Sequence, residues 1–151
     1  MEKQRTFVMI KPDAVQRGLV GEIINRFEKK GIKIVAMKMV AVTREQAEKH
    51  YAVHKGKPFF QPTVKYIISS PVVVMVLEGI NAIEMVRGIM GKTDPQQAEN
   101  GTIRGDYGQF IGRNIVHGSD SKETAKFEIN LWFKPGEIAK YKKIDEEWLS
   151  E

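Results

Sequence analysis

Residues 72–79 read VVVMVLEG, and this stretch is the strongest strand candidate in the chain. It is a continuous apolar run that ends at a glycine, which is typical of a buried strand. Two further runs have the length and composition of strands, TFVMIK at 6–11 and IKIVAMKMVAV at 32–42, and NIVHG at 114–118 is a shorter candidate.

Helical periodicity fills the intervals between these strands. VGEIINRFEKKG places four apolar residues on one face and ends at Gly31, which fits a helix C-terminus. NAIEMVRGIM has a similar apolar face, with Asn81 in position to cap it. A last helix, KETAKFEINLWF, begins after Ser121. Shorter helices are expected in EQAEKHYAVH, after a capping box of Thr43 with Gln46, and in FQPTVKYIIS.

Without the short helices, the order of elements is β-α-β-β-α-β. This order predicts an α+β, ferredoxin-like fold, in which a four-stranded antiparallel sheet carries two helices on one face. Right-handed crossovers then determine the topology. We expect a single domain over residues 1–151.

Two regions do not belong to this pattern. Residues 91–113 show no clear period, and the region is longer than the roughly 12–15 residues usual for a structureless loop. Because it is rich in glycine and contains Pro95, we interpret it as an ordered, functional loop insertion. Residues 134–151 form a C-terminal extension of mixed charge, which we predict to be helix-like.

Composition limits the possible classes of protein. Hydrophobic residues make up 42% and charged residues 28%, as in ordinary globular domains. No apolar run approaches the roughly 18–20 residues of a membrane span, and the N-terminus lacks the apolar core of a signal peptide. There is no cysteine, which excludes disulfides and thiolate sites. We therefore expect a cytoplasmic protein that does not bind membranes.

The formal net charge of +5 has several interpretations. A basic surface attracts nucleic acid, nucleotide phosphates or acidic lipids, but the charge can also serve solubility alone. Lys11, Arg87, Arg104 and Arg113 stand singly at the ends of elements or in the glycine-rich loop, where an anion site is easily built.

Two motifs resemble known sites but do not match them. GIMGKTD contains Gly-Lys-Thr, but Val86 occupies the position where a P-loop needs its first glycine. His50 and His54 are spaced to share a zinc ion on a helix, but no glutamate follows His50 and no third ligand is evident. A partly buried or surface pair is the better interpretation, and we predict no metal ligand from the protein.

His117, in RNIVHGSDS at 113–121, is the strongest candidate for chemistry. A lone histidine beside apolar residues is usually structural. This one lies at a strand end, Gly118 allows close approach of the chain, and Glu128 follows in the next helix. A carboxylate bonded to one imidazole nitrogen leaves the other as a nucleophile or base. Roughly three quarters of a histidine with a pKa of about 6.5 is neutral at pH 7.

An attack by this histidine on phosphorus would require fixed cations around the transferred group. Lys11, Arg87 and Arg104 are the candidates. Each lies at a strand end, near a helix end or in the long loop, so that they could converge on one crevice.

Four segments together resemble the nucleoside diphosphate kinase family: TFVMIKPDAVQRGLVGEI, HYAVHKGKPFF, TIRGDYGQFIGRN and NIVHGSDS. The similarity runs from about residue 5 to about residue 140, with the motifs in the family's order and spacing. It implies the ferredoxin-like fold and the transfer of a γ-phosphate from a nucleoside triphosphate to a nucleoside diphosphate. The transfer would be ping-pong, through a phosphohistidine on His117.

The resemblance also implies roles for other residues. Glu128 and Ser119 would orient the histidine ring, and Tyr51 would lie near the transferred phosphate. The residues implied to bind the nucleotide are Lys11 and Asn114 at the ribose hydroxyl, with Lys11 also at the phosphates, then Arg87, Thr93 and Arg104 at the phosphates, and Phe59 and Ile111 on the two faces of the base. Stacking on an aromatic ring accepts every base, which explains broad base tolerance.

Mg²⁺ is expected to enter with the nucleotide, held mainly by phosphates and water. The resemblance further implies a homo-oligomer, with a hexamer favoured and a tetramer possible, and the 91–113 loop at subunit contacts. Nucleic-acid binding is not expected as the primary role, because TFVMIK carries one aromatic residue and VVVMVLEG none. A catalytically inactive scaffold is disfavoured, because a competent residue fills every matched position.

Overall fold

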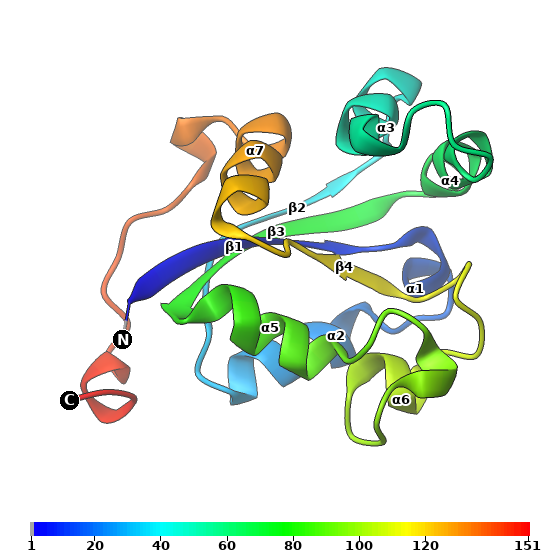
Figure 1. The fold of residues 1–151 in the computed structure, drawn as a ribbon. Coiled ribbons are helices and arrows are strands. Elements are labelled where there is room, and N and C mark those ends of the chain that lie inside the picture. The colour runs from blue at the N-terminus through cyan, green and yellow to red at the C-terminus, as the bar shows by residue number, and fades with distance from the viewer. Residues whose placement is uncertain (1) are drawn as a thin grey trace.

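The computed structural model describes residues 2–151 and contains a four-stranded antiparallel sheet. Its strands lie in the order β2-β3-β1-β4 (Figure 1). Their bounds are β1 Lys3–Ile10, β2 Lys33–Val40, β3 Val72–Ile80 and β4 Val116–Gly118. Together with the two crossover helices, this sheet confirms the predicted ferredoxin-like fold.

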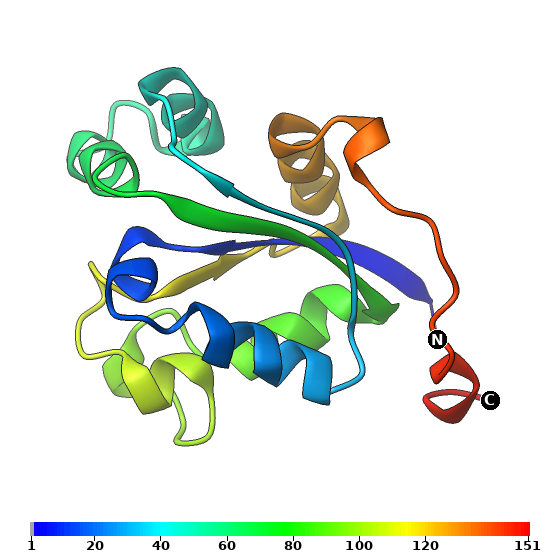
Figure 2. The ribbon, with the colours of Figure 1, turned by 180° about the vertical axis from the view of Figure 1, so that it is seen from behind.

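Helices cover both faces of the sheet (Figures 1 and 2). The crossover helices α2 (Val20–Lys29) and α5 (Ala82–Met90) lie on one face, as predicted. The other face carries α7 (Lys122–Trp132), together with α3 (Arg44–His50) and α4 (Phe60–Ile67).

Strand β3 is buried on both faces, and this explains why its sequence does not alternate between apolar and polar residues. Successive side chains of a strand point to opposite faces. Val72, Val74 and Val76 enter the core beside α7, while Val73, Met75 and Leu77 enter the core beside α2 and α5. Because both faces are buried, all six positions are apolar, each contributing about 1.5–3 kcal/mol of burial free energy.

The region around β1 differs from the prediction in one boundary and one additional helix. β1 begins at Lys3 rather than at residue 6, because Lys3–Arg5 pair with the end of β3 although their side chains are polar. A short helix, α1 (Pro12–Gln16), was not predicted. Pro12 does end the strand, but it also occupies the first turn of this helix, where its missing N–H costs nothing.

Strand β4 is shorter than the predicted 114–118. Ile115 has a φ of 76°, and the Val116 N–H donates to the Asn114 carbonyl at 2.8 Å. This bond spans two residues and defines a γ-turn. The chain therefore enters the sheet only at Val116.

The 91–113 loop is ordered, as predicted, but it contains two helical elements that its sequence did not indicate. These are a 3-10 turn, η2 (Pro95–Gln97), and the helix α6 (Ile103–Tyr107). Thr102 caps α6 by accepting from the Gly105 N–H at 3.0 Å. Arg26 of α2 contacts Asp106 at 2.7 Å and so ties α6 to the body of the sheet. One short turn is too brief to produce a detectable hydrophobic period.

The helix caps were predicted with one error. Thr43 forms the predicted capping box with Gln46, and Ser121 accepts from the Thr124 N–H at 3.1 Å. Asn81, however, has a φ of 51°, and its side chain donates to the Glu84 carboxylate instead of capping a backbone N–H.

The prediction of a helix-like tail at 134–151 was wrong. The tail holds two 3-10 turns, η3 (Pro135–Glu137) and η4 (Glu146–Trp148), joined by extended chain. It returns along β2, where Ala139 N–H donates to the Val35 carbonyl at 2.8 Å. Lys33 reaches Glu146 at 2.9 Å, and this donor lowers the pKa of Glu146 to about 2.

A further 3-10 turn, η1 (Ala52–His54), follows α3. None of the helices in residues 2–151 is long and apolar enough to cross a bilayer.

Candidate functional site

His117 lies on the edge strand β4, opposite Met9 of β1. Directly opposed residues share a face of the sheet, so His117 points to the side covered by α7. Its Nε2 lies 2.8 Å from Oε2 of Glu128 on α7, while 24% of the side chain remains exposed. The neighbouring Gly118 faces α5, where a Cβ atom would lie 2.8 Å from the sulfur of Met90. The predicted contact between histidine and carboxylate is therefore present.

Glu128 is buried, and both of its carboxylate oxygens are engaged. Oε2 faces His117, and Oε1 accepts from the Ser119 hydroxyl at 2.5 Å. Ser119 is held by β1, because its N–H donates to the Phe7 carbonyl at 3.1 Å. An ionised carboxylate only accepts hydrogen bonds, so Nε2 of His117 carries the proton and Nδ1 keeps its lone pair. The structure thus distinguishes the two ring nitrogens, which the sequence could not do.

Three cations stand close to one another near this histidine. Burial and the charge of Arg104 lower the pKa of Lys11 to about 8, although Asp13 acts in the opposite direction. Burial and the charge of Arg87 lower the pKa of Arg104 to about 10. Mutual repulsion of this kind would be relieved by a bound anion. The predicted phosphate-binding cations therefore do lie within electrostatic reach of one another.

Arg104 has a second role that the sequence did not indicate. Its guanidinium donates to the carbonyls of Gly91, Asn114 and Val116 at 2.8, 3.2 and 2.6 Å. A buried guanidinium needs such partners, and these three tie the 91–113 loop to the γ-turn before His117. Arg104 is therefore a structural cross-link as well as a cation.

Asn114 and Thr93 join the same network. Lys11 Nζ donates to Asn114 Oδ1 at 2.7 Å, and Asn114 Nδ2 donates to the Thr93 carbonyl at 3.0 Å. These bonds determine the orientation of the Asn114 amide. Lys11 and Asn114, which the sequence predicts at the ribose, are thus direct neighbours.

Asp13 and Tyr66 support the γ-turn, and neither residue was selected as a candidate from the sequence. Asp13 Oδ2 accepts from the Ile115 N–H at 3.1 Å, and its Oδ1 accepts from the Tyr66 hydroxyl. A β-branched residue at positive φ costs about 1–3 kcal/mol and persists only where its surroundings hold it. No sequence signal could reveal this role, since isoleucine is not expected in that conformation.

Tyr51 ends α3 beside Glu128. Its hydroxyl is buried and has no hydrogen-bond partner in residues 2–151. Burial, and then the charge of Glu128, raise the pKa of Tyr51. The hydroxyl therefore stays protonated and is free to donate to an anion. This agrees with its predicted place near a transferred phosphate.

The two predicted base-binding residues are exposed. Phe59 is 49% exposed, whereas the adjacent Phe60 is buried at 4%. Phe59 is thus not an ordinary core residue. Ile111, on the 91–113 loop, is 52% exposed. Both lie outside the hydrogen-bonded network of Lys11, Asn114 and Arg104.

His50 and His54 share no cluster of three or more possible metal ligands within residues 2–151. His50 is buried, while His54 is half-buried with its ring against Phe59, 5.1 Å between centroids. His50, His117 and Glu128 do bring three possible ligand atoms within 4.8 Å of one another. However, the carboxylate already accepts from His117 and Ser119, so the cluster suits ring orientation better than ion binding. Asp120 is exposed beside it and belongs to no such cluster in the described part of the chain.

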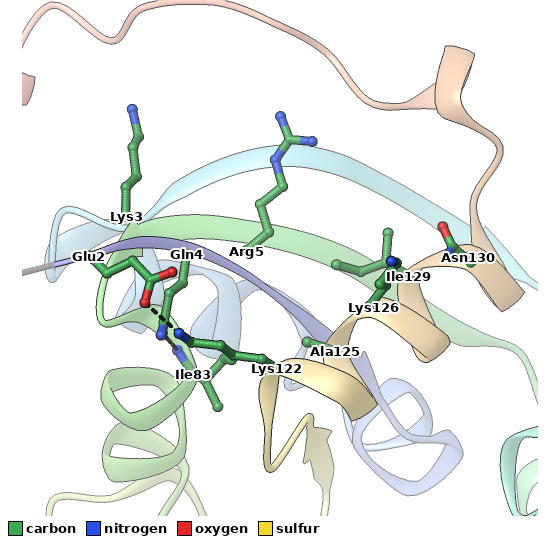
Figure 3. Close-up of a pocket in the computed structure, with 10 residues that line it drawn as sticks. All are labelled: Glu2, Lys3, Gln4, Arg5, Ile83, Lys122, Ala125, Lys126, Ile129 and Asn130. Atoms are coloured by element: carbon green, nitrogen blue, oxygen red, sulfur yellow. Dashed lines mark hydrogen bonds and ion pairs between the residues drawn. The ribbon is translucent and has the colours of Figure 1, made fainter.

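A second basic groove lies away from His117, between the start of β1 and α7 (Figure 3). Figure 3 shows Lys3 and Arg5 extending from the side of β1 opposite to Gln4. Two of the cations here are in ion pairs: Lys122 pairs with Glu2 at 2.6 Å, and Arg5 pairs with Glu78 at 3.2 Å. Opposite charges thus offset one another in this groove, whereas the cations near His117 repel one another.

Comparison with known proteins agrees with this geometry. A family model described as nucleoside diphosphate kinase matches residues 4–138. A nucleoside diphosphate kinase from Archaeoglobus fulgidus is 59% identical over 148 residues, which cover 98% of each chain. One from Pyrococcus furiosus is 62% identical over 143 residues, covering 93% of this chain and 89% of that protein.

Solved structures show the same similarity. The nucleoside diphosphate kinase of Halobacterium salinarum in complex with CDP superposes with a TM-score of 0.97 at 47% identity, covering 99% of this chain and 100% of that one. A nucleoside diphosphate kinase family protein from Babesia bovis gives 0.95 at 44% identity, covering 97% and 99%.

Proposed function

This chain belongs to the nucleoside diphosphate kinase family and transfers phosphate between nucleotides, and on that premise we propose that Nδ1 of His117 is the atom that carries the phosphoryl group. One observation supports this assignment above the others. Glu128 holds Nε2 at 2.8 Å, which leaves the lone pair of Nδ1 free in a side chain that solvent reaches.

The first half-reaction forms one bond and breaks one. The Nδ1 lone pair attacks the γ-phosphorus of a nucleoside triphosphate, and the bond from that phosphorus to the β,γ-bridging oxygen breaks. The nucleoside diphosphate then leaves. Nε2 keeps its proton throughout, and the carboxylate of Glu128 compensates the positive charge that develops on the ring. A second diphosphate takes the phosphoryl group by the reverse path, so one site serves both directions.

Fixed charges would stabilise the transferred group. Lys11, Arg87 and Arg104 supply cations whose mutual repulsion a triphosphate relieves, and Tyr51 supplies a buried hydroxyl without a partner. In the proposal Thr93 joins them at the phosphates, and Asn114, oriented by Lys11, receives the ribose hydroxyl.

The base would contact apolar surface only. Phe59 would stack on one face of the base and Ile111 would cover the other, and neither side chain can read a hydrogen-bonding edge. Stacking is worth about 1–3 kcal/mol for any base. This supports broad base tolerance.

The proposal retains the other expectations from the sequence. Mg²⁺ would enter on the nucleotide phosphates, and no direct protein ligand is assigned to it. Residues 1–151 would form one domain, working in the cytoplasm as a homohexamer, or as a tetramer. The exposed Met37 and Met39 on the outer strand β2, 52% and 62% exposed, support association.

A nucleic-acid-binding role is not favoured. A ferredoxin-like module that binds RNA displays aromatic side chains on an open sheet face. Here helices cover both faces, and Phe7, the aromatic residue of β1, is fully buried.

Transfer of label tests the proposed function. The protein is incubated with γ-labelled ATP, freed of nucleotide, and examined for acid-labile, base-stable label. We expect label on wild type, none on His117→Ala, and full labelling of His54→Ala, a matched change at another histidine. Turnover should disappear with the label, by at least about 1,000-fold. Labelling and turnover by a folded His117→Ala protein would disprove the assignment.

A further inference from the structure

His50 is a buried histidine that the proposed reaction does not use. It lies in the last turn of α3, and its side chain is 1% exposed. Its ring packs against those of Tyr51, Trp132 and His117, with centroid distances of 4.7, 5.7 and 4.8 Å. It therefore lies directly behind the nucleophile.

The tautomer of His50 follows from its neighbour. The indole N–H of Trp132 donates to His50 Nδ1 at 3.0 Å, and an indole nitrogen can only donate. Nδ1 must therefore hold a lone pair, which leaves the proton of the neutral ring on Nε2. Burial, followed by the charges of His117 and Lys11, lowers the pKa of His50, which agrees with a neutral ring.

The proton on Nε2 points toward the carboxylate that orients His117. Nε2 of His50 lies 3.5 Å from Oε2 of Glu128, the same oxygen that faces His117 at 2.8 Å. This Nε2 has no hydrogen-bond partner in residues 2–151. A buried N–H without a partner costs about 1–3 kcal/mol, and a shift of a few tenths of an ångström would satisfy it. The Nε2–H of His50 is thus an unused hydrogen-bond donor next to the Glu128 carboxylate.

We propose that His50 is a positioning residue for phosphoryl transfer: its Nε2–H, oriented by Trp132, closes onto Oε2 of Glu128 as His117 becomes phosphorylated. The inference rests on the proposed phosphorylation of His117. Positive charge develops on the His117 ring during transfer, and the carboxylate must stay ionised and aimed at Nε2. A second donor on Oε2 favours the ionised carboxylate and resists its rotation.

Groups from every neighbouring element face this carboxylate. They are His50 and Tyr51 from α3, His117 from β4, and Ser119 just after it. Tyr51 does not hydrogen-bond to Glu128, since its hydroxyl has no partner among the described residues. Removal of the His50 donor therefore leaves only Ser119 and His117 to hold the charge. The acid limb of activity should then move to higher pH.

Substitution of His50 by glutamine or asparagine distinguishes the contributions of its two ring nitrogens. Glutamine places an N–H near the position of Nε2, whereas asparagine reaches only as far as Nδ1. Phenylalanine keeps the ring volume with neither nitrogen. We expect His50→Gln to retain kcat within about threefold, and His50→Asn and His50→Phe to lose about tenfold, with the KM for nucleotide unchanged. Trp132→Phe, which frees the tautomer, should lose less.

Several outcomes would overturn the inference. If His50 serves packing alone, His50→Phe will equal or exceed His50→Gln, and the acid limb will not move. A loss shared equally by all three variants, or carried in KM, would also contradict it. Labelling of wild type at His117 is measured in parallel, so that failure of the proposed function is distinguished from failure of the His50 inference.

A measurement on the wild-type protein avoids any dependence on how the variants fold. Nitrogen-15 NMR of the labelled histidines reports which ring nitrogen carries the proton. We expect His50 to be protonated at Nε2 in the free enzyme, and its Nε2–H signal to move downfield when His117 is phosphorylated. Protonation at Nδ1, or no change on phosphorylation, would overturn the proposal.

Discussion

Behind His117 the carboxylate of Glu128 is buried and fully hydrogen-bonded, whereas at Phe59 the site ends in an exposed aromatic side chain. Glu128 has both oxygens bonded and is 3% exposed, while Phe59 is 49% exposed. In the proposed function, the side around His117 would bind the phosphates, which all nucleotides share, so its geometry can be fixed. The side at Phe59 would bind the base, which differs among nucleotides, and stacking tolerates that difference. Rigidity is thus concentrated where the substrate does not vary.

The largest effect is expected from removing the charge of the buried carboxylate, Glu128. Glu128→Gln keeps the shape but loses one acceptor, so that either Ser119 or His117 loses its bond. We expect kcat to fall about 100-fold with little change in KM, measured by steady-state kinetics. As a control, Glu123→Gln on the exposed side of α7 should be near wild type. A loss below about threefold in Glu128→Gln would mean that orientation of the ring matters little.

A second substitution acts on the γ-turn that precedes His117. Asp13→Asn leaves one oxygen to serve both the Ile115 N–H and the Tyr66 hydroxyl. We expect kcat/KM to fall about 20-fold, equivalent to about 1.8 kcal/mol for an unsatisfied buried donor. Tyr66→Phe, which leaves the bond to Ile115 intact, should lose less. Equal losses in the two variants would show that the support of Ile115 is not the cause.

The pH dependence of activity tests the proposed role of Lys11 in binding the nucleotide. Lys11 is charged below its lowered pKa of about 8 and neutral above it, so its attraction for phosphate is lost as pH rises. We expect kcat/KM to fall about tenfold per pH unit above 8, at constant ionic strength. Lys11→Arg, whatever its activity at pH 7, should not show this limb. A limb that persists in Lys11→Arg must come from another group.

The smallest effect is expected on the exposed side. Phe59→Ala removes a stacking surface that is already half open to water, so the KM should rise about fivefold, or about 1 kcal/mol. The rise in KM should be similar for adenine, guanine, cytosine and uracil nucleotides, and kcat should not change. A rise confined to one base would show that this side reads the base after all.

The comparison also explains what the sequence could reveal. The strands and crossover helices were predictable because burial on both faces leaves long apolar runs, as in β3. His117 and Glu128 were candidates because of their positions at a strand end and in the next helix, and the family resemblance added Ser119. The γ-turn at Ile115 and the roles of Asp13, Tyr66 and His50 were not predictable. They depend on contacts between distant segments, and isoleucine is not expected at a φ of 76°. The tail was mispredicted because mixed charge resembles a helix surface.

The placement of β4 at the sheet edge has a consequence for how the protein folds. Phe7 and Ser119, which join β1 to the histidine motif, are 112 positions apart. Contacts of such range close late, because the entropy of the large loop must be overcome first. The histidine motif therefore joins β1, and Asn114 meets Lys11, only after most of the chain is in place. A nascent or partly unfolded chain carries every catalytic residue and yet has no site, so that catalytic competence coincides with completion of the fold.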